Sequence, residues 1–166
     1  MLCGMPMPSI APGHRALRKG RDTRPNGLYL LTTTTHGRRP MFAQWHCARA
    51  AAASLAQPES WPGAELLCWV LMPDHWHGLV RLQDSGALGV AMRHAKGRSA
   101  RAVNLARGRS GPVWSRAFHD HALRADEDIL RCARYVIANP LRAGLVERIG
   151  DYPYWDAVWL GHVATP

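Results

Sequence analysis

The chain lacks the patterns that mark disulfide-rich, zinc-ribbon and membrane-spanning proteins. No run of 18 apolar residues occurs, and prolines interrupt the N-terminal segment, where a signal peptide would need an apolar core. The cysteines form no C-x-x-C pair, so neither a disulfide framework nor a zinc ribbon is expected. We therefore expect a soluble protein in the reducing cytoplasm. The four cysteines are Cys3, Cys47, Cys68 and Cys132.

Acidic residues and lysine are scarce. The 166 residues include 12 Asp and Glu against 21 Lys and Arg, which gives a formal net charge of +9 at pH 7. Nearly all of the positive charge is arginine, which suits bidentate phosphate contacts and stacking on bases better than lysine does. A polyanion is the natural partner of such a chain. Biased codon usage also produces Ala- and Arg-rich chains, so the placement of the charge is better evidence than its total.

One segment, from Ser85 through His119, contains no acidic residue at all. Most of it is a predicted amphipathic helix over Leu88–Ala106, with apolar residues on one face and basic residues opposite. Charges of one sign repel one another unless a counter-charge binds, so we expect phosphate binding here rather than a merely solubilising face. The predicted DNA-binding residues are Arg93, Lys96, Arg98, Arg101, Arg107 and Arg116.

Hydrophobic periodicity predicts an α+β fold. The element order βαββαβ, followed by one more helix, is typical of a ferredoxin-like antiparallel sheet with helices packed on one face and an additional C-terminal helix. A site would then lie on the exposed face of the sheet or in the groove between the sheet and the last helix. Strands are predicted over Leu28–Thr35, Glu65–Met72, His75–Leu82 and Val113–Leu123, and helices over Trp45–Ala56, Leu88–Ala106 and Glu127–Ala138, the last with Asp126 as its N-cap.

The segment Met72–Gly78, with the sequence MPDHWHG, places two histidines around one hydrophobic residue at the start of a predicted strand. Because side chains alternate along a strand, His75 and His77 point to the same face and Trp76 to the other. Two neighbouring imidazoles make half of a metal site. A half-exposed strand with no ligand role is the alternative.

Tyr135 occupies an unusual place in the last predicted helix. On a helical projection it lies roughly 100° from the apolar stripe, on the polar edge. A tyrosine there most often packs its ring and hydrates its hydroxyl. Asn139 follows about one turn later, although Pro140 favours the end of the helix at that point. The amide oxygen of Asn139 is of the type that binds a hard cation.

Four motifs occur together in one order along the chain. They resemble the REP-associated tyrosine transposases, a family of transposase IS200-like proteins in the HUH single-tyrosine superfamily. The resemblance extends from about Leu28 to Trp155, and the ordered set is far more specific than any one motif. The motifs are Gly37–Phe42, Val70–Val80, Val113-Trp114 with Phe118-His119-Asp120, and Arg134–Val146.

The resemblance implies a single-stranded DNA endonuclease and strand transferase that acts on hairpin-forming palindromic repeats through a 5′-phosphotyrosine intermediate. Carried over to this chain, it makes Tyr135 the nucleophile and His75, His77 and Asn139 the ligands of Mg²⁺ or Mn²⁺. Two positions depart from the usual pattern: Asp74 replaces an Asn, and His119 replaces a Tyr. Neither is expected to contact a predicted ligand.

Composition, through the prolines, glycines and basic residues of the N-terminal segment, and the extent of the resemblance together divide the chain. Residues 1–26 are expected to form a basic, disordered arm, residues 27–160 a transposase IS200-like catalytic domain, and residues 161–166 a tail. Single-stranded or hairpin DNA is the expected partner, and both a monomer and a homodimer remain open. Two alternative functions also remain: a catalytically inactive DNA-binding protein of the same fold, and a metal-dependent hydrolase of small substrates.

Overall fold

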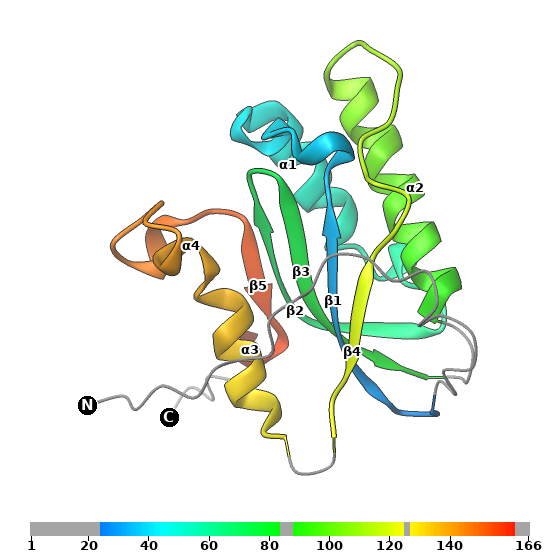
Figure 1. Ribbon diagram of the computed structural model, residues 1–166, viewed down its shortest axis with the longest axis vertical. Coiled ribbons are helices and arrows are strands. Elements are labelled where there is room, and N and C mark those ends of the chain that lie inside the picture. The colour runs from blue at the N-terminus through cyan, green and yellow to red at the C-terminus, as the bar shows by residue number, and fades with distance from the viewer. Residues whose placement is uncertain (1–23, 84–87, 125–126, 162–166) are drawn as a thin grey trace.

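A five-stranded antiparallel sheet forms the centre of the molecule (Figure 1). The computed structural model describes residues 24–83, 88–124 and 127–161. The strand order β4-β1-β3-β2-β5 confirms the ferredoxin-like α+β fold. The strands are β1 (Leu28–Thr34), β2 (Ala64–Met72), β3 (His75–Leu82), β4 (His119–Ala122) and β5 (Trp155–Ala157).

Helices cover both faces of this sheet (Figure 1). On one face, α1 (Trp45–Leu55) and α2 (Leu88–Ala106) pack against each other, and on the other lie α3 (Ile129–Ile137) and the short α4 (Asn139–Arg142). Alternation along β3 separates the two cores, because Trp76 is buried with α1 and α2 whereas Leu79 is buried with α3. No helix in the described part of the chain combines the length and the apolar character that crossing a bilayer needs.

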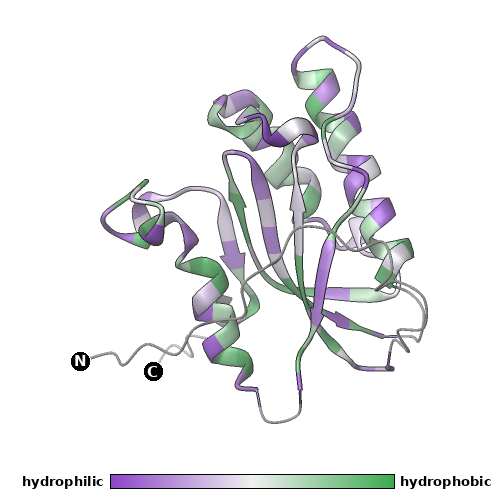
Figure 2. Cartoon of the chain, viewed as in Figure 1, coloured by the Kyte–Doolittle hydropathy of each residue, from purple (hydrophilic) through white to green (hydrophobic). Residues whose placement is uncertain are grey.

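The strand predicted over Val113–Leu123 is only four residues long. Val113 and Trp114 are consecutive yet both are buried in the same core, which the alternation of a strand forbids. The carbonyls of residues 115–117 accept hydrogen bonds from Lys96 Nζ rather than from a neighbouring strand. What remains is β4, a short and mostly hydrophilic edge strand (Figure 2), of the kind that limits pairing with other sheets.

The C-terminal part of the chain also differs from the prediction, whereas the bounds of β1, α1 and β2 differ by one residue each. The last predicted helix begins at Ile129, two residues later than expected, because the Asp128 carboxylate accepts hydrogen bonds from the amides of Leu130 and Arg131. The cap predicted at Asp126 lies outside the described residues. The chain also breaks after Ile137, and α4 starts at Asn139 with Pro140 in its first turn. Strand β5 was not predicted, since three residues carry no readable periodicity.

Candidate active site

Strand β3 places His75 and His77 on the face of the sheet that α3 covers. The ring centroids are 4.7 Å apart, and the ring planes are nearly perpendicular at 84°. Between them, the fully buried Trp76 stacks on Trp61 in the opposite core, with centroids 5.3 Å apart. Gly78 is required beside this indole, because a Cβ there would lie 2.2 Å from the Trp76 ring. Packing of Trp76 therefore fixes the direction in which both imidazoles point.

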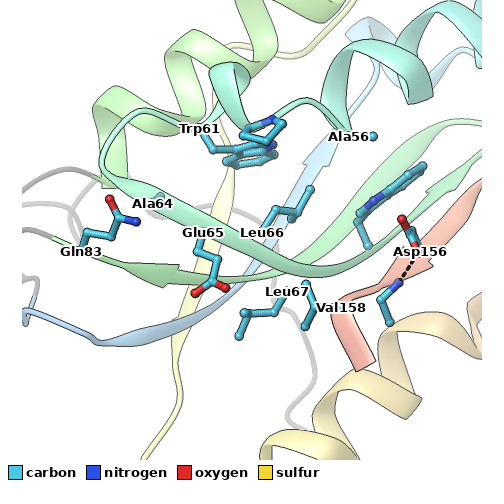
Figure 3. A pocket seen from close by; sticks show the side chains of 12 residues that line it. Ala56, Trp61, Ala64, Glu65, Leu66, Leu67, Gln83, Asp156 and Val158 are labelled. Carbon is cyan, nitrogen blue, oxygen red and sulfur yellow. Dashed lines mark hydrogen bonds between the residues drawn. The ribbon is translucent and has the colours of Figure 1, made fainter. Parts of the chain in front are cut away.

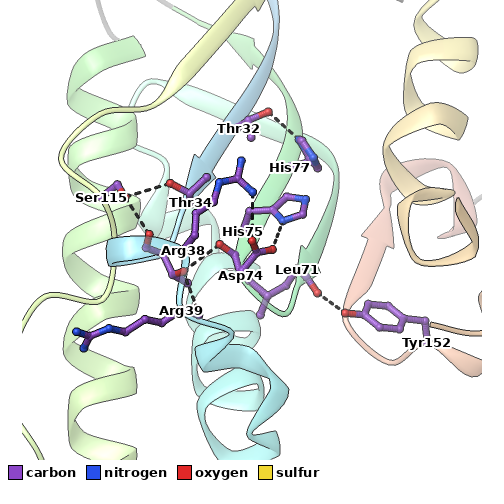
Figure 4. A network of polar contacts seen from close by, with 11 residues as sticks. Thr32, Thr34, Arg38, Arg39, Leu71, Asp74, His75, His77, Ser115 and Tyr152 are labelled. Atoms are coloured by element: carbon purple, nitrogen blue, oxygen red, sulfur yellow. Dashed lines mark hydrogen bonds and ion pairs between the residues drawn. The ribbon is translucent and has the colours of Figure 1, made fainter. Parts of the chain in front are cut away.

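Each imidazole uses its Nδ1 atom within the protein (Figure 4). His75 Nδ1 lies 2.5 Å from Asp74 Oδ1, and His77 Nδ1 lies 2.7 Å from Thr32 Oγ1 on β1. The expectation that Asp74 contacts no predicted ligand is therefore wrong, because the β2–β3 turn folds the carboxylate back onto its neighbour. Such contacts orient a ring and leave Nε2 as the atom that can bind a metal.

Asp74 links the histidines to a cation. Arg38 Nη1 lies 3.2 Å from Asp74 Oδ2 (Figure 4). Burial acts to raise the pKa of Asp74, but the hydrogen bond and charge of His75 and the charge of Arg38 outweigh it, so the pKa is lowered overall. Asp74 is therefore a carboxylate at neutral pH and holds His75 from one side and Arg38 from the other.

His77 is electrically neutral under ordinary conditions. Burial first, then the nearby charges of His75 and Arg142, lower the pKa of His77 to about 3. A metal ligand must be the neutral imidazole, and His77 is in that form in this environment.

Tyr135 lies on α3 and is 38% exposed. The guanidinium of Arg142 sits 4.0 Å from the centre of its ring, and Arg142 Nη1 also donates to the Tyr135 carbonyl over 2.9 Å. The break between α3 and α4 allows this return, since Arg142 lies on the second helix. Arg142 also lowers the pKa of His77, so it contacts the candidate nucleophile and acts electrostatically on a candidate ligand.

The hydroxyls of the other three tyrosines form hydrogen bonds. Tyr29 accepts from the Arg24 amide, Tyr152 donates to the Leu71 carbonyl (Figure 4), and Tyr154 donates to the Trp45 carbonyl. Burial raises the pKa of Tyr152 to about 12, which makes its phenolate inaccessible. Within the described residues, the Tyr135 hydroxyl has no hydrogen-bond partner, whereas each of the other three hydroxyls has one.

Asn139 begins α4 and is half-buried. Its Nδ2 donates to the Val136 carbonyl over 2.8 Å, which leaves Oδ1 as the side-chain atom suited to a cation. The described residues hold no group of three His, Cys, Asp or Glu side chains that could bind a metal. A site at His75 and His77 would therefore need an oxygen ligand of another kind, and an amide oxygen is one.

Comparison with known proteins identifies the family. The family model described as "Transposase IS200 like" matches residues 24–136. This chain belongs to that family. The matched range contains His75, His77 and Tyr135 and ends before Asn139.

Two curated relatives and one solved structure agree with this assignment. A REP-associated tyrosine transposase from Escherichia coli K12 is 24% identical over 131 residues, covering 77% of this chain and 74% of its own. A candidate REP-associated tyrosine transposase from Haemophilus influenzae is 26% identical over 144 residues, covering 81% of each chain. A solved REP-associated tyrosine transposase bound to a REP hairpin shares the fold, with a TM-score of 0.62 and 24% identity over 83% of this chain and 81% of that one.

In this IS200-like chain, the basic residues predicted from α2 lie on the opposite face of the sheet from the histidines. Lys96 donates to the carbonyls of Ser115, Arg116 and Ala117, so its ammonium holds the chain segment before β4. Arg107, at the end of α2, contacts Met41 Sδ over 3.3 Å. The remaining predicted side chains are exposed to solvent: Arg93, Arg98, Arg101 and Arg116.

A separate hollow of about 390 Å³ lies along the first half of β2 and beside β5 (Figure 3). Its walls are mainly apolar, and its acidic residues are Glu65, which pairs with Arg81, and Asp156. No Lys, Arg or His lines it. Since β2 runs away from this hollow toward Met72, which pairs with His75, the hollow lies apart from the candidate active site.

Sequence reasoning did not assign site roles to Thr32, Arg38, Asp74 and Arg142. Thr32 and His77 are 45 positions apart and meet only through the register of β1 with β3. Arg142 reaches Tyr135 only because the helix breaks at Ala138. The departure of Asp74 from the family pattern was the one available signal, since a carboxylate beside a candidate ligand can orient it.

Proposed function

We propose that this chain is a metal-dependent single-stranded DNA endonuclease and strand transferase that acts on hairpin-forming palindromic repeats. The relatives named for REP elements support the substrate class, and the basic composition supports a DNA partner. A cytoplasmic location is part of the proposal, because a reducing compartment suits the free thiols of Cys47, Cys68 and Cys132.

The observation that carries the proposal is the available hydroxyl of Tyr135 beside Arg142, whose charge also acts on His77. A tyrosine nucleophile must be reachable by DNA. Tyr135 is 38% exposed, whereas Tyr29 is buried and the Tyr152 hydroxyl donates to the Leu71 carbonyl. The Arg142 guanidinium, 4.0 Å from the centre of the ring, would place a positive charge close to the phosphate that Tyr135 attacks.

The proposed reaction exchanges one phosphodiester for another. Tyr135 Oη attacks the phosphorus, a Tyr O–P bond forms, and the P–O3′ bond breaks. The phenol proton passes to solvent or a base, and the leaving oxygen takes up a proton to become a free 3′-hydroxyl. The product is a 5′-phosphotyrosine. A 3′-hydroxyl can attack this linkage in turn and release Tyr135, so strand transfer needs no nucleotide cofactor.

The donor set fits a divalent cation. His75 and His77 would present Nε2, since their Nδ1 atoms contact Asp74 and Thr32, and Asn139 would supply an amide oxygen. Bound there, Mg²⁺ or Mn²⁺ would polarise the phosphate and offset the charge of the transition state. The protein residues orient the site: Asp74 and Thr32 hold the rings, and Arg38 holds Asp74.

A labelled hairpin oligonucleotide tests the proposal. Wild-type protein with Mn²⁺ should form a covalent protein–DNA adduct and nick the strand, and EDTA should stop both reactions. His75→Ala and His77→Ala should also stop cleavage yet keep hairpin binding within a few-fold, because contacts to phosphates supply most of the affinity.

The matched pair Tyr135→Phe and Tyr154→Phe separates the possible functions. Each variant loses one phenol oxygen, but only Tyr135→Phe should lose both the adduct and nicking. Cleavage by Tyr135→Phe at the wild-type rate would point to a metal-dependent hydrolase. Hairpin binding by a wild-type protein that never cuts would point to an inactive DNA-binding protein. Either result would overturn the proposed mechanism.

A further inference from the structure

A pocket of about 390 Å³ lies where the end of α2 meets the segment that follows β1. We name it the basic pocket. No acidic side chain lines it, and Arg39 and Arg109 are exposed at its walls. Three guanidinium groups around a hollow favour an anion. The residues that line the basic pocket are Arg39, Pro40, Met41, Gln44, His46, Arg107 and Arg109.

A glycine turn builds one wall of the basic pocket. Gly108 has a φ of +59°, and the amides of Gly108 and Arg109 donate to the carbonyls of Leu105 and Asn104. This is the Schellman arrangement that ends a helix and reverses the chain. It places Arg107 and Arg109, on either side of the glycine, at the same pocket, while Arg107 also contacts Met41 of the other wall.

The other wall of the basic pocket is continuous with the candidate active site. The Thr35 hydroxyl donates to the Arg39 carbonyl and the Thr35 amide to the Asp74 carbonyl, and the Phe42 amide donates to the Pro73 carbonyl. The segment after β1 is thus fixed to the turn that carries His75. Of its two arginines, Arg38 pairs with Asp74 (Figure 4), whereas Arg39 lines the basic pocket.

Trp45 stands beside the basic pocket with 65% of its surface exposed. Its ring centroid lies 6.3 Å from that of His46, which lines the pocket. An exposed indole does not contribute the large free energy that its burial would give. Beside a basic pocket, an exposed aromatic ring is the arrangement with which proteins stack the bases of a single strand.

We propose that the basic pocket and Trp45 bind the single-stranded DNA that flanks the hairpin. Arg39 and Arg109 contact a backbone phosphate, and Trp45 stacks on a base. The proposal rests on the proposed function for the identity of the hairpin, and it assigns the flanking strand to a surface distinct from Tyr135 and the two histidines. Through Arg38 and Arg39, one short segment joins the two surfaces.

Binding to three DNA probes tests this assignment: a hairpin with short single-stranded flanks, the same hairpin without flanks, and an unstructured oligonucleotide. Trp45→Ala should weaken binding of the flanked hairpin about 5- to 150-fold. Arg39→Ala with Arg109→Ala should weaken it as well and lower the salt slope by roughly 0.7 for each lost phosphate contact. Both variants should bind the bare hairpin as wild type does.

Arg24→Ala with Arg124→Ala is the matched control, because it removes the same charge at the opposite end of the sheet. Arg24 precedes the start of β1, and Arg124 follows Leu123, whose amide donates to the Leu28 carbonyl there. His75 pairs with Thr34 at the other end of β1. This control should bind all three probes as wild type does. If the pocket variants match the control on the flanked hairpin and on the oligonucleotide, the assignment is overturned.

The oligonucleotide separates this proposal from the proposed function. A protein that never cleaves hairpins would refute the function, yet loss of oligonucleotide binding in the pocket variants would still support the pocket. Photo-crosslinking of wild-type protein to a halogenated oligonucleotide avoids any folding defect of the variants. Adducts on the peptide that contains Trp45 are expected, and adducts confined to other peptides would refute the assignment.

Discussion

At the scale of single residues, the site depends on contacts that hold each imidazole from behind. Asp74 and Thr32 each engage one Nδ1 atom, so both Nε2 atoms are presented without rotation of either ring. Such supporting contacts commonly change metal affinity by about 10- to 100-fold. In the proposed metal site, His75 and His77 would bind the cation, and Asp74 and Thr32 would orient these ligands.

Thr32→Val should weaken Mn²⁺ binding about 10-fold or more, because the isosteric side chain cannot hydrogen-bond His77 Nδ1. Isothermal titration of the DNA-free protein with Mn²⁺ measures this directly. Thr34→Val is the control on the same strand, since Thr34 Oγ1 donates to Ser115 rather than to a histidine. Equal Mn²⁺ affinity in the two variants would show that the Thr32 contact does not orient a ligand.

The lowered pKa of His77 predicts a pH dependence of stability. Between pH 6.5, its ordinary value, and about 3, the unfolded chain binds a proton that the folded chain does not. Stability should therefore fall as the pH drops below 6.5, by up to about 2 kcal/mol at pH 5. Urea unfolding of metal-free wild type and His77→Gln at pH 5 and pH 8 measures the difference. Parallel losses in the two proteins would contradict the assigned pKa.

At the scale of elements, α2 carries two kinds of basic residue. Lys96 connects the helix to the segment before β4, whereas Arg93, Arg98 and Arg101 are exposed. The helix lies across the sheet from His75 and His77, so DNA that contacts both must pass around an edge or an end of the sheet. The basic pocket at the end of α2 offers such a connection.

Reversal of Arg93, Arg98 and Arg101 to Glu should weaken single-strand binding and reduce the salt slope by roughly 0.7 per lost phosphate contact. Lys96→Met should instead lower the melting temperature, because three carbonyls lose their donor. Titrations at several salt concentrations and thermal unfolding distinguish the two effects. An unchanged slope in the triple variant would make this face of α2 a solubilising surface.

At the scale of the whole molecule, the sequence predicted those features that repeat along an element. Strand β3 and helix α2 have the predicted bounds, because apolar periodicity over eight or more residues is readable. The four residues of β4 and the three of β5 are too short for such a pattern, and pairing partners determine them. The contact of Thr32 with His77 and the return of Arg142 to Tyr135 depend on register and on a helix break.

In the candidate site, too, some residues could be named from the sequence, and others depend on tertiary contacts. Alternation places His75 and His77 on one face, and family motifs point to Tyr135, so these residues could be named from the sequence. The sequence could not show which tyrosine hydroxyls form hydrogen bonds, because tertiary packing decides which carbonyls Tyr152 and Tyr154 reach. Most of the predicted basic arm, residues 1–26, lies outside the described residues, so the arm stays a prediction.

Peptide mapping of the covalent adduct tests the central claim most directly. Wild-type protein is incubated with a single-stranded repeat hairpin and Mn²⁺, digested, and analysed by mass spectrometry for a peptide that carries a 5′-linked nucleotide. The mechanism predicts that the modified residue is Tyr135. A phosphotyrosine at Tyr29, Tyr152 or Tyr154, or cleavage of the hairpin without any modified tyrosine, would contradict it.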